Sequence, residues 1–323
     1  MQILITGSAG FIGSHLSRHL SKKGYRVHGI DSISDYYEKK LKLDRLKWVK
    51  NKNFRFTQLN LLDKKNLEIF FSENKFDLII HLAAQPGVLY SLENPFAYIE
   101  NNIIAYLNIL ELSKKYEVKN LIYASSSSVY GKGNKLPFSE SAKTDTPLTV
   151  YSATKITDEY ISYVYSNLYS MNFVGLRFFT VYGPWGRPDM SPFIFVKNIL
   201  KGNVIDLYDA GRGVRDFTYI DDVINSISKI VQKFKKNKKL PKHEVFNIGA
   251  SKPIMMKHFL NLIELNLKKK AKVSLKKNRK ADMQKTYSDS SKFQKHYGYT
   301  HKIDLKNGIK QFIIWFKKYY SVK

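Results

Sequence analysis

The residues Gly7-Ser8-Ala9-Gly10-Phe11-Ile12-Gly13, close to the start of the chain, decide the fold. An apolar stretch before them predicts a buried strand over Ile3–Thr6, and the pattern after them predicts a helix over Phe11–Lys23. In such a unit the first glycine allows a tight turn, the second lets the backbone approach a pyrophosphate, and the third lets the helix pack closely on the sheet. The motif therefore predicts a dinucleotide site at the helix amides.

Strand and helix patterns alternate up to about residue 180. Strands are predicted at Arg26–Ile30, Phe54–Gln58, Leu78–Leu82, Asn120–Ser125 and Gly175–Phe179, and helices at Lys64–Asn74, Pro95–Tyr116 and from Tyr151 onward. This alternation is typical of right-handed crossovers between parallel strands. We therefore expect an α/β fold with a doubly wound parallel (Rossmann) sheet.

Asp31 ends the second predicted strand and indicates which dinucleotide binds. A carboxylate there would accept from the adenosine ribose hydroxyls and repel a 2′-phosphate, so NAD is favoured over NADP. Asn60 is suited to the adenine edge, and Asn101 and Asn102 would support the loop on the nicotinamide side. The candidate cofactor contacts are Gly7, Gly10, Phe11, Ile12, Gly13, Asp31, Asn60, Leu61, Leu82, Ala83, Ala84, Asn102, Tyr151, Lys155 and Phe178.

The second part of the chain has a different pattern. Pro184, Gly186, Pro188 and Pro192 mark a loop-rich stretch, followed by shorter helices and lysine-rich runs. We expect an NAD-binding Rossmann domain over residues 1–178 and a smaller C-terminal α/β substrate domain over residues 179–323, with the chain crossing between them. The substrate domain would close over the carboxyl ends of the strands.

Composition limits the class of protein. Of the 323 residues, 43% are hydrophobic, as in a globular protein, and none is cysteine, which excludes disulfides and zinc–thiolate sites. We predict no metal site. No signal peptide or membrane-length apolar segment is recognisable, so a cytoplasmic protein without membrane insertion is expected. The lysines behind the net charge of +27 are scattered along the chain, which argues against a nucleic-acid partner.

Tyr151 and Lys155 stand four residues apart and share one face of the predicted helix. An ammonium beside a phenol favours the phenolate, which can accept a hydroxyl proton while hydride leaves the same carbon for NAD. The strand that ends in Ser125-Ser126-Ser127-Ser128 places hydroxyls near the same substrate oxygen. The candidate catalytic residues are Tyr151, Lys155, Ser126 and Ser128.

Longer motifs add a resemblance to a known family. They are His81-Leu82-Ala83-Ala84-Gln85, Tyr90-Ser91-Leu92-Glu93-Asn94-Pro95, Tyr123 through Gly131, Gly175 through Met190, and Arg215 through Asp222. With them the chain resembles the extended short-chain dehydrogenases/reductases of the nucleotide-sugar epimerase type, and most closely the UDP-glucuronate 4-epimerases. The resemblance implies reversible 4-epimerisation of UDP-glucuronate to UDP-galacturonate through a 4-keto sugar, with NAD tightly bound.

The resemblance also implies roles for single residues. Tyr151 would be the acid/base, Lys155 would tune it and hold the ribose, and the serines would polarise the 4-oxygen. Thr180, Ser127 and Arg187 would contact the carboxylate, which must be restrained because the 4-keto intermediate can lose CO2. Arg215 and Arg279 would hold the diphosphate through their forked donors. The implied substrate contacts are Ser126, Ser127, Ser128, Tyr151, Thr180, Arg187, Arg215, Arg279 and Asp282.

Two of these serines separate the chain from related enzymes. Sugar 4,6-dehydratases carry an Asp-Glu pair at the positions of Ser127 and Ser128, and UDP-glucuronate decarboxylases carry a glutamate at the position of Ser128. Leu89, Asn60 and Arg279 depart from the uronate pattern. They leave the reaction type intact but leave open a 4-epimerase of another UDP-sugar (an N-acetylhexosaminuronate or a neutral hexose). A UDP-glucuronate decarboxylase is kept as a separate alternative.

A non-catalytic, NAD-sensing protein is the alternative from a different class, but such a protein has no need of an acid/base tyrosine. The family commonly dimerises through the helices expected at Pro95–Tyr116 and Tyr151–Tyr169, so we expect a homodimer. Tyr160, Tyr163 and Val164 are candidates for its interface, although core packing is an equal alternative for them.

Overall fold

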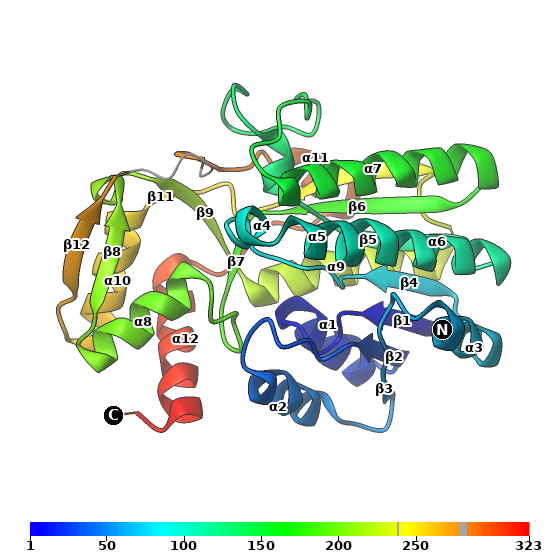
Figure 1. Cartoon of the computed structure of the whole chain (residues 1–323), viewed down its shortest axis with the longest axis horizontal. Coiled ribbons are helices and arrows are strands. Elements are labelled where there is room, and N and C mark those ends of the chain that lie inside the picture. The colour runs from blue at the N-terminus through cyan, green and yellow to red at the C-terminus, as the bar shows by residue number, and fades with distance from the viewer. Residues whose placement is uncertain (238, 278–282, 323) are drawn as a thin grey trace.

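The computed structural model describes residues 1–237, 239–277 and 283–322. The chain forms a large α/β part around a seven-stranded sheet and a smaller part with a three-stranded and a two-stranded sheet. The two parts lie side by side in Figure 1, with the amino terminus in the large part and the carboxyl terminus in the small one.

The seven-stranded sheet is parallel throughout, with the order β10-β6-β5-β4-β1-β2-β3. Its strands are β1 (Gln2–Thr6), β2 (Arg26–Asp31), β3 (Phe54–Gln58), β4 (Leu78–His81), β5 (Asn120–Ser126), β6 (Asn172–Phe178) and β10 (His243–Ile248). Every residue of β4 and β6 is buried, because helices cover both faces of a parallel sheet. The predicted doubly wound fold is confirmed. The strand order reverses between β1 and β4, the point at which such sheets bind ligands.

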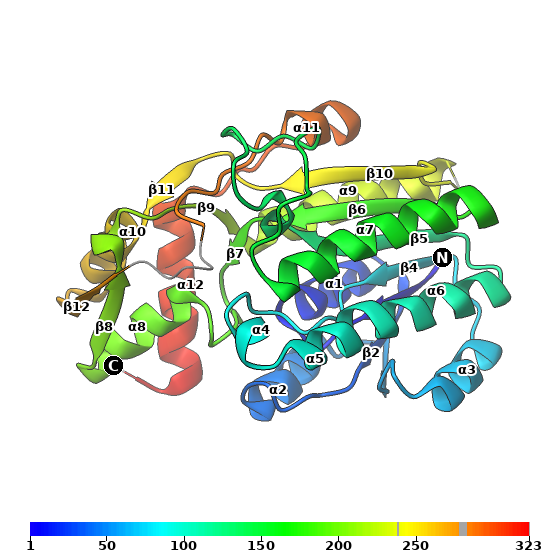
Figure 2. The same ribbon diagram turned by 45° about the horizontal axis from the view of Figure 1, so that its top comes forward.

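Helices cover the two faces of this sheet (Figure 2). On one face, α2 (Lys39–Val49) and α9 (Ile220–Asn237) pack against α1 (Phe11–Lys22). On the other face lie α3 (Lys64–Glu73), α6 (Ala105–Lys115) and α7 (Val150–Tyr169). Separate hydrophobic cores form on the two faces, one beneath α1 and α9 and one beneath α3 and α6.

Parts of this architecture differ from the sequence prediction. The helix expected over Pro95–Tyr116 is divided into α5 (Pro95–Tyr98), a π-helical segment η1 (Ile99–Ile104) and α6. Helix α2 and strand β10 are not predicted by the sequence pattern, although both belong to the large part. The short helices α4 (Tyr90–Glu93) and η2 (Ser127–Tyr130) follow β4 and β5 and line the carboxyl edge of the sheet.

The small part contains a three-stranded sheet of β11 (Pro253–Met255), β9 (Val214–Tyr219) and β7 (Thr180–Tyr182). Strands β8 (Val204–Tyr208) and β12 (Lys272–Lys276) form a separate parallel pair, and η3 (Asp209–Gly211) follows β8. The remaining helices are α8 (Ser191–Lys201), α10 (Met256–Leu267), α11 (Ser291–Tyr297) and α12 (Leu305–Tyr320). The expected smaller C-terminal α/β part is thus present.

The chain leaves the large part after β6 and returns to it with α9, which packs on α1, and with β10, which pairs with β6. The assignment of residues 179–323 to a UDP-sugar-binding domain stays a prediction. Within the described parts of the chain, no helix is both long and apolar enough to cross a membrane.

Candidate active site

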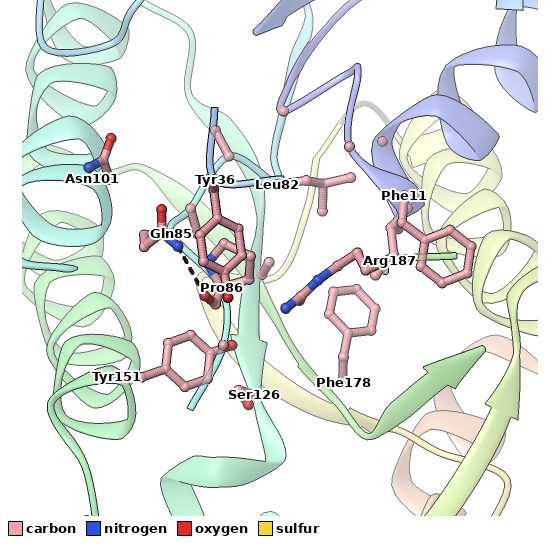
Figure 3. Close-up of a pocket in the computed structure, with 18 of the residues that line it drawn as sticks. Phe11, Tyr36, Leu82, Gln85, Pro86, Asn101, Ser126, Tyr151, Phe178 and Arg187 are labelled. Atoms are coloured by element: carbon pink, nitrogen blue, oxygen red, sulfur yellow. Dashed lines mark hydrogen bonds between the residues drawn. The ribbon is translucent and has the colours of Figure 1, made fainter. Parts of the chain in front are cut away.

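A cavity of about 660 Å³ lies at the carboxyl ends of the central strands, between the large and the small part. Figure 3 shows that Tyr151 and Ser126 point into one region of it, with Arg187 and Phe178 opposite. The predicted site residues that line it are Gly7, Gly10, Phe11, Ile12, Gly13, Asp31, Asn60, Leu61, Leu82, Ala83, Ala84, Ser126, Ser127, Ser128, Tyr151, Lys155, Phe178, Thr180, Arg187 and Arg215.

Among the described residues, one predicted site residue, Asn102, is not part of this lining. Asn102 is fully buried behind the cavity, where its amide oxygen accepts from Gln85 N at 2.7 Å and its amide nitrogen donates to Thr154 Oγ1 at 3.0 Å. Asn102 thus holds the Gln85 loop, while Asn101 beside it lines the cavity. Arg279 and Asp282 lie outside the described residues, so their predicted substrate contacts stay predictions.

The glycine turn leaves room for a ligand because side chains are excluded from it. A Cβ on Gly13 would lie 2.1 Å from Gly7 O, and one on Gly10 would lie 2.9 Å from the same oxygen. Gly7 itself has a φ of +69°, in the left-handed region that favours glycine. Ser14 N makes the first intrahelical bond, to Gly10 O, so the amides of the first turn of α1 remain available to an anion.

Asp31 closes the turn from the end of β2. Its Oδ2 accepts from Ala9 N at 3.1 Å, and its Oδ1 accepts from Ile33 N at 2.8 Å. Burial raises the pKa of the Asp31 carboxyl, and these two backbone donors act in the opposite direction. Each carboxylate oxygen retains a lone pair toward the cavity, so Asp31 can accept further hydrogen bonds from a diol.

Tyr151 and Lys155 lie on the cavity side of α7, one turn apart. The Tyr151 ring makes an edge contact with the Tyr98 ring, with centroids 5.9 Å apart. Lys155 is only 2% exposed, and its Nζ lies 3.0 Å from Asp158 Oδ2. The sequence analysis missed Asp158, although its position three residues after Lys155 on a helix is a recognisable spacing for an ion pair.

Burial shifts the pKa values of two ionisable groups near Lys155. Burial raises the pKa of Asp158 to about 6, and the nearby Lys155 lowers it. Burial, together with the charge of Lys155, lowers the pKa of His81 to about 3. At neutral pH His81 is therefore uncharged, and the charge of Lys155 favours the ionised form of Asp158.

The serines at the end of β5 offer one unused hydroxyl. Ser126 Oγ caps η2 by accepting from Ser128 N at 3.2 Å. Ser128 Oγ is buried, and among the described residues no atom hydrogen-bonds to it. Because a buried hydroxyl without a partner is costly, Ser128 is suited to an oxygen of a bound ligand.

A buried ion pair supports this strand end from behind. Arg177 on β6 donates to Glu159 from Nε at 2.9 Å and from Nη2 at 2.7 Å. Ser125 Oγ donates to Glu159 Oε1 at 2.6 Å. These bonds tie β5, β6 and α7 together immediately beneath Ser126 and Tyr151.

Arg187 reaches into the middle of the cavity (Figure 3), but it already has a carboxylate partner. It donates to Asp189 from Nε at 3.0 Å and from Nη2 at 2.5 Å, and Tyr36 OH donates to the same carboxylate at 3.2 Å. Burial raises the pKa of Asp189, but the contacts with Arg187 lower it more, and the net value falls below the usual range. Tyr36 is a lining residue that the sequence analysis did not single out.

Arg215 reaches the cavity from β9, next to a buried support. Its Nη1 donates to Val214 O at 2.9 Å and to Gln284 O at 3.2 Å. The following residue, Asp216, is fully buried and accepts from Ser288 Oγ at 2.7 Å and from Ser251 N at 3.0 Å. These bonds fix Arg215 and the segment that carries the lining residue Thr286.

Comparison with known proteins gives the class. The model of the NAD dependent epimerase/dehydratase family matches residues 3–249. UDP-glucuronate 4-epimerase 4 of Arabidopsis thaliana is 40% identical over 99% of this chain and 76% of its own length. The chain therefore belongs to the NAD dependent epimerase/dehydratase family.

Solved structures agree with this class. UDP-glucuronic acid 4-epimerase from Bacillus cereus, in complex with UDP-glucuronic acid and NAD, has a TM-score of 0.92 and 32% identity, over 99% of this chain and 100% of that one. UDP-glucose 4-epimerase from Thermotoga maritima, with UDP-glucose, has a TM-score of 0.88 and 30% identity, also over 99% of this chain and 100% of that one.

The prediction of NAD as the cofactor is confirmed by the family, and the residues of the cavity fit it. The glycine turn is a cradle that a Cβ would fill, and the free amides of α1 suit a pyrophosphate. Asp31 suits the ribose hydroxyls. The individual contacts with NAD stay predictions.

Proposed function

We propose that this NAD-dependent nucleotide-sugar 4-epimerase interconverts UDP-glucuronate and UDP-galacturonate. One observation carries the proposal: the Tyr151–Lys155 pair shares its cavity with a hydroxyl-lined strand end and with a guanidinium, that of Arg187. At positions 127 and 128 this strand end has serines, not the acids of dehydratases and decarboxylases.

The coarser part of this assignment is confirmed. The family, together with relatives named as UDP-glucuronate and UDP-glucose 4-epimerases, gives an NAD-dependent nucleotide-sugar 4-epimerase. The choice of a uronate as the sugar rests on the 40% identity to the plant enzyme and on the guanidinium of Arg187 in the cavity.

We assign the catalytic roles as follows, with the placement of the residues in support. When bound, NAD would supply reversible hydride transfer at C4 of the sugar. Tyr151 takes the proton of the 4-hydroxyl and later gives it back, and Lys155 favours the phenolate form that does so. Ser128 Oγ, which is buried with no partner among the described residues, donates to the 4-oxygen, and Ser126 holds the backbone of Ser128 in place.

At the end of the cavity that is expected to hold the sugar, a substrate carboxylate would meet both a positive and a negative side chain. We assign Thr180 and Ser127 as hydroxyl donors to it and Arg187 as its cation. Because Asp189 already neutralises Arg187, the carboxylate would share the guanidinium rather than bind it alone. A shared guanidinium binds the carboxylate less tightly. Weaker binding suits a sugar that must rotate in the cavity between the two hydride transfers. Arg215 is the assigned diphosphate contact within the described residues.

The test is an assay of the purified protein with a panel of UDP-sugars, read by proton NMR. We expect UDP-glucuronate to be converted to a mixture with UDP-galacturonate without added NAD, and without release of CO2. Release of CO2 as the main outcome would favour a decarboxylase. Faster epimerisation of a neutral hexose or an N-acetylhexosaminuronate would assign the enzyme to that sugar.

We also propose that the protein is a homodimer in the cytoplasm. Helices α4 to α7 and the segment η1 between α5 and α6 lie close together in Figure 2. They expose a group of large apolar side chains. These are Leu92, Phe96, Ile99, Ile104, Leu107, Tyr160, Tyr163, Val164, Leu168 and Tyr169. Tyr160, Tyr163, Val164 and Leu168 of α7 recur at helical spacing on one face, and exposed apolar side chains that gather in this way are typical of a subunit interface.

Leu168→Glu is expected to convert the dimer to a monomer, because it places a charge in this patch, where Leu168 is 67% exposed. Light scattering measures the molar mass. The control is Leu265→Glu, at a leucine that is 71% exposed on α10, away from the patch. A wild-type molar mass of one chain would contradict the proposed dimer.

A further inference from the structure

Arg45 of α2 is fully buried, and it is not a lining residue of the cavity. Its guanidinium makes five hydrogen bonds, as many as it has N–H donors. They run to Ala9 O at 3.1 Å, Tyr37 OH at 2.6 Å, Trp185 O at 3.1 and 2.7 Å, and Gly186 O at 3.2 Å.

All of these acceptors are neutral oxygens, and all but one are backbone carbonyls. Burying a charge is expensive, and a buried arginine is usually compensated by a carboxylate. Here the direct acceptors are Tyr37 OH and backbone that approaches the guanidinium from two directions, while the Asp31 carboxylate acts on Arg45 through its charge, without a hydrogen bond. The geometry of that backbone is therefore fixed by Arg45, since movement of either side would leave donors of a buried cation unsatisfied.

The two sides belong to different regions of the active site. Ala9 lies within the glycine turn, between Gly7 and Gly10. Trp185 and Gly186 immediately precede Arg187, whose side chain reaches into the sugar end of the cavity. We call residues 183–186 the sugar-side loop. Arg45 thus joins the turn expected to bind the pyrophosphate to the loop that presents Arg187.

The sugar-side loop has an unusual backbone conformation, and within it Gly186 N donates to Gly183 O at 3.1 Å. Gly183 has a φ of +142°, which glycine adopts without strain, whereas Trp185 has a φ of +62°, a value that residues with a side chain rarely adopt and that surrounding contacts must enforce. The Trp185 ring packs against Trp48 of α2 and Trp315 of α12, with centroids 5.6 and 5.4 Å apart. The backbone of the loop, in contrast, is bound by Arg45.

We propose that Arg45 is a positioning residue that couples the NAD-binding turn to the sugar-side loop, so that binding of NAD orders the loop that presents Arg187. The inference needs NAD as the cofactor and the glycine turn as its site, but not UDP-glucuronate as the substrate. A failure of the proposed sugar specificity therefore leaves it intact.

The first test uses the wild-type protein and hydrogen–deuterium exchange, with and without NAD. Trp185 and Gly186 do not line the cavity, so a change in their amide exchange would be transmitted rather than caused by direct contact. We expect NAD to slow exchange in residues 7–13 and also in residues 183–186. Slower exchange in residues 7–13 alone would overturn the proposal.

The second test is Arg45→Lys, which keeps the positive charge but has a single nitrogen that cannot span both sides. We expect NAD to protect residues 7–13 of this variant but no longer residues 183–186. With NAD in excess, KM for the UDP-sugar that the enzyme uses should stay raised by about 5-fold or more, in the range of ordinary coupling energies. The drop in kcat should be smaller.

The matched control is Arg18→Lys. Arg18 of α1 stacks on Trp48 at 4.6 Å, close to the same aromatic rings. Its replacement by lysine should change neither the protection of residues 183–186 by NAD nor KM for the UDP-sugar. If Arg45 served only stability, Arg45→Lys would lower the melting temperature, while NAD would still protect residues 183–186 and excess NAD would restore KM. Either of those results would overturn the proposal. If Arg45→Lys fails to fold, the wild-type exchange experiment still decides.

Discussion

Tyr151→Phe is expected to lower kcat by about 10²–10⁴-fold, because a positioned acid/base group contributes that much to catalysis. Phenylalanine keeps the ring and its edge contact with Tyr98, so the cavity should keep its shape. The variant loses only the hydroxyl that exchanges a proton with the sugar. Binding of NAD and of the UDP-sugar should therefore change little.

The measurement combines turnover by proton NMR, NAD content by absorbance, and UDP-sugar affinity by calorimetry. Tyr160→Phe is the matched control, since it removes a hydroxyl from the same helix at a side chain that is 62% exposed. Near-normal turnover of Tyr151→Phe would show that the acid/base is another group. A large loss of NAD or substrate binding would show that Tyr151 acts in binding instead.

Gly13→Ala is expected to yield protein without retained NAD and therefore without activity. The added Cβ would lie 2.1 Å from Gly7 O and 2.8 Å from Gly7 C, and both are backbone atoms. Helix α1 must then move away from the turn, which displaces the amides of its first turn. Overpacking of this kind also costs about 1–3 kcal/mol of stability.

The test is the ratio of absorbance at the nucleotide and protein maxima after gel filtration, with circular dichroism to check the fold. Gly213→Ala is the control, because the nearest atom to its added Cβ is Gln284 O at 3.7 Å, an ordinary contact. A folded Gly13→Ala protein with its full content of NAD would contradict the assigned role of the turn.

The alternating pattern predicted most of the large sheet because each of those strands is decided locally. The glycine turn and the apolar runs at Ile3–Thr6 and Leu78–Leu82 are local signals, and β1 and β4 lie within a residue of these ranges. Strand β6 begins at Asn172, three residues before its predicted start. Strand β10 is different, since it joins the sheet through pairing with β6, about 70 residues earlier in the chain. Its sequence, His-Glu-Val-Phe-Asn-Ile, carries no comparable signal.

The candidate site likewise has features that the local sequence predicts and contacts that it does not. The predicted lining residues cluster because parallel strands all end at one edge, so that motifs after different strands meet there. The partner of Lys155 was recognisable from helical spacing, but the partners of Arg45 were not. Apart from Tyr37 OH, they are backbone carbonyls of Ala9, Trp185 and Gly186, and only the docking of α2 against two distant loops brings them together.

The aromatic packing around Trp185 has a practical consequence. The chain has three tryptophans, and Trp185 packs against both of the others. Intrinsic tryptophan emission of this enzyme therefore originates entirely from the surroundings of the sugar-side loop. The wavelength and intensity of that emission offer a label-free optical reporter of the state of the loop, which a stopped-flow instrument can follow while the enzyme works.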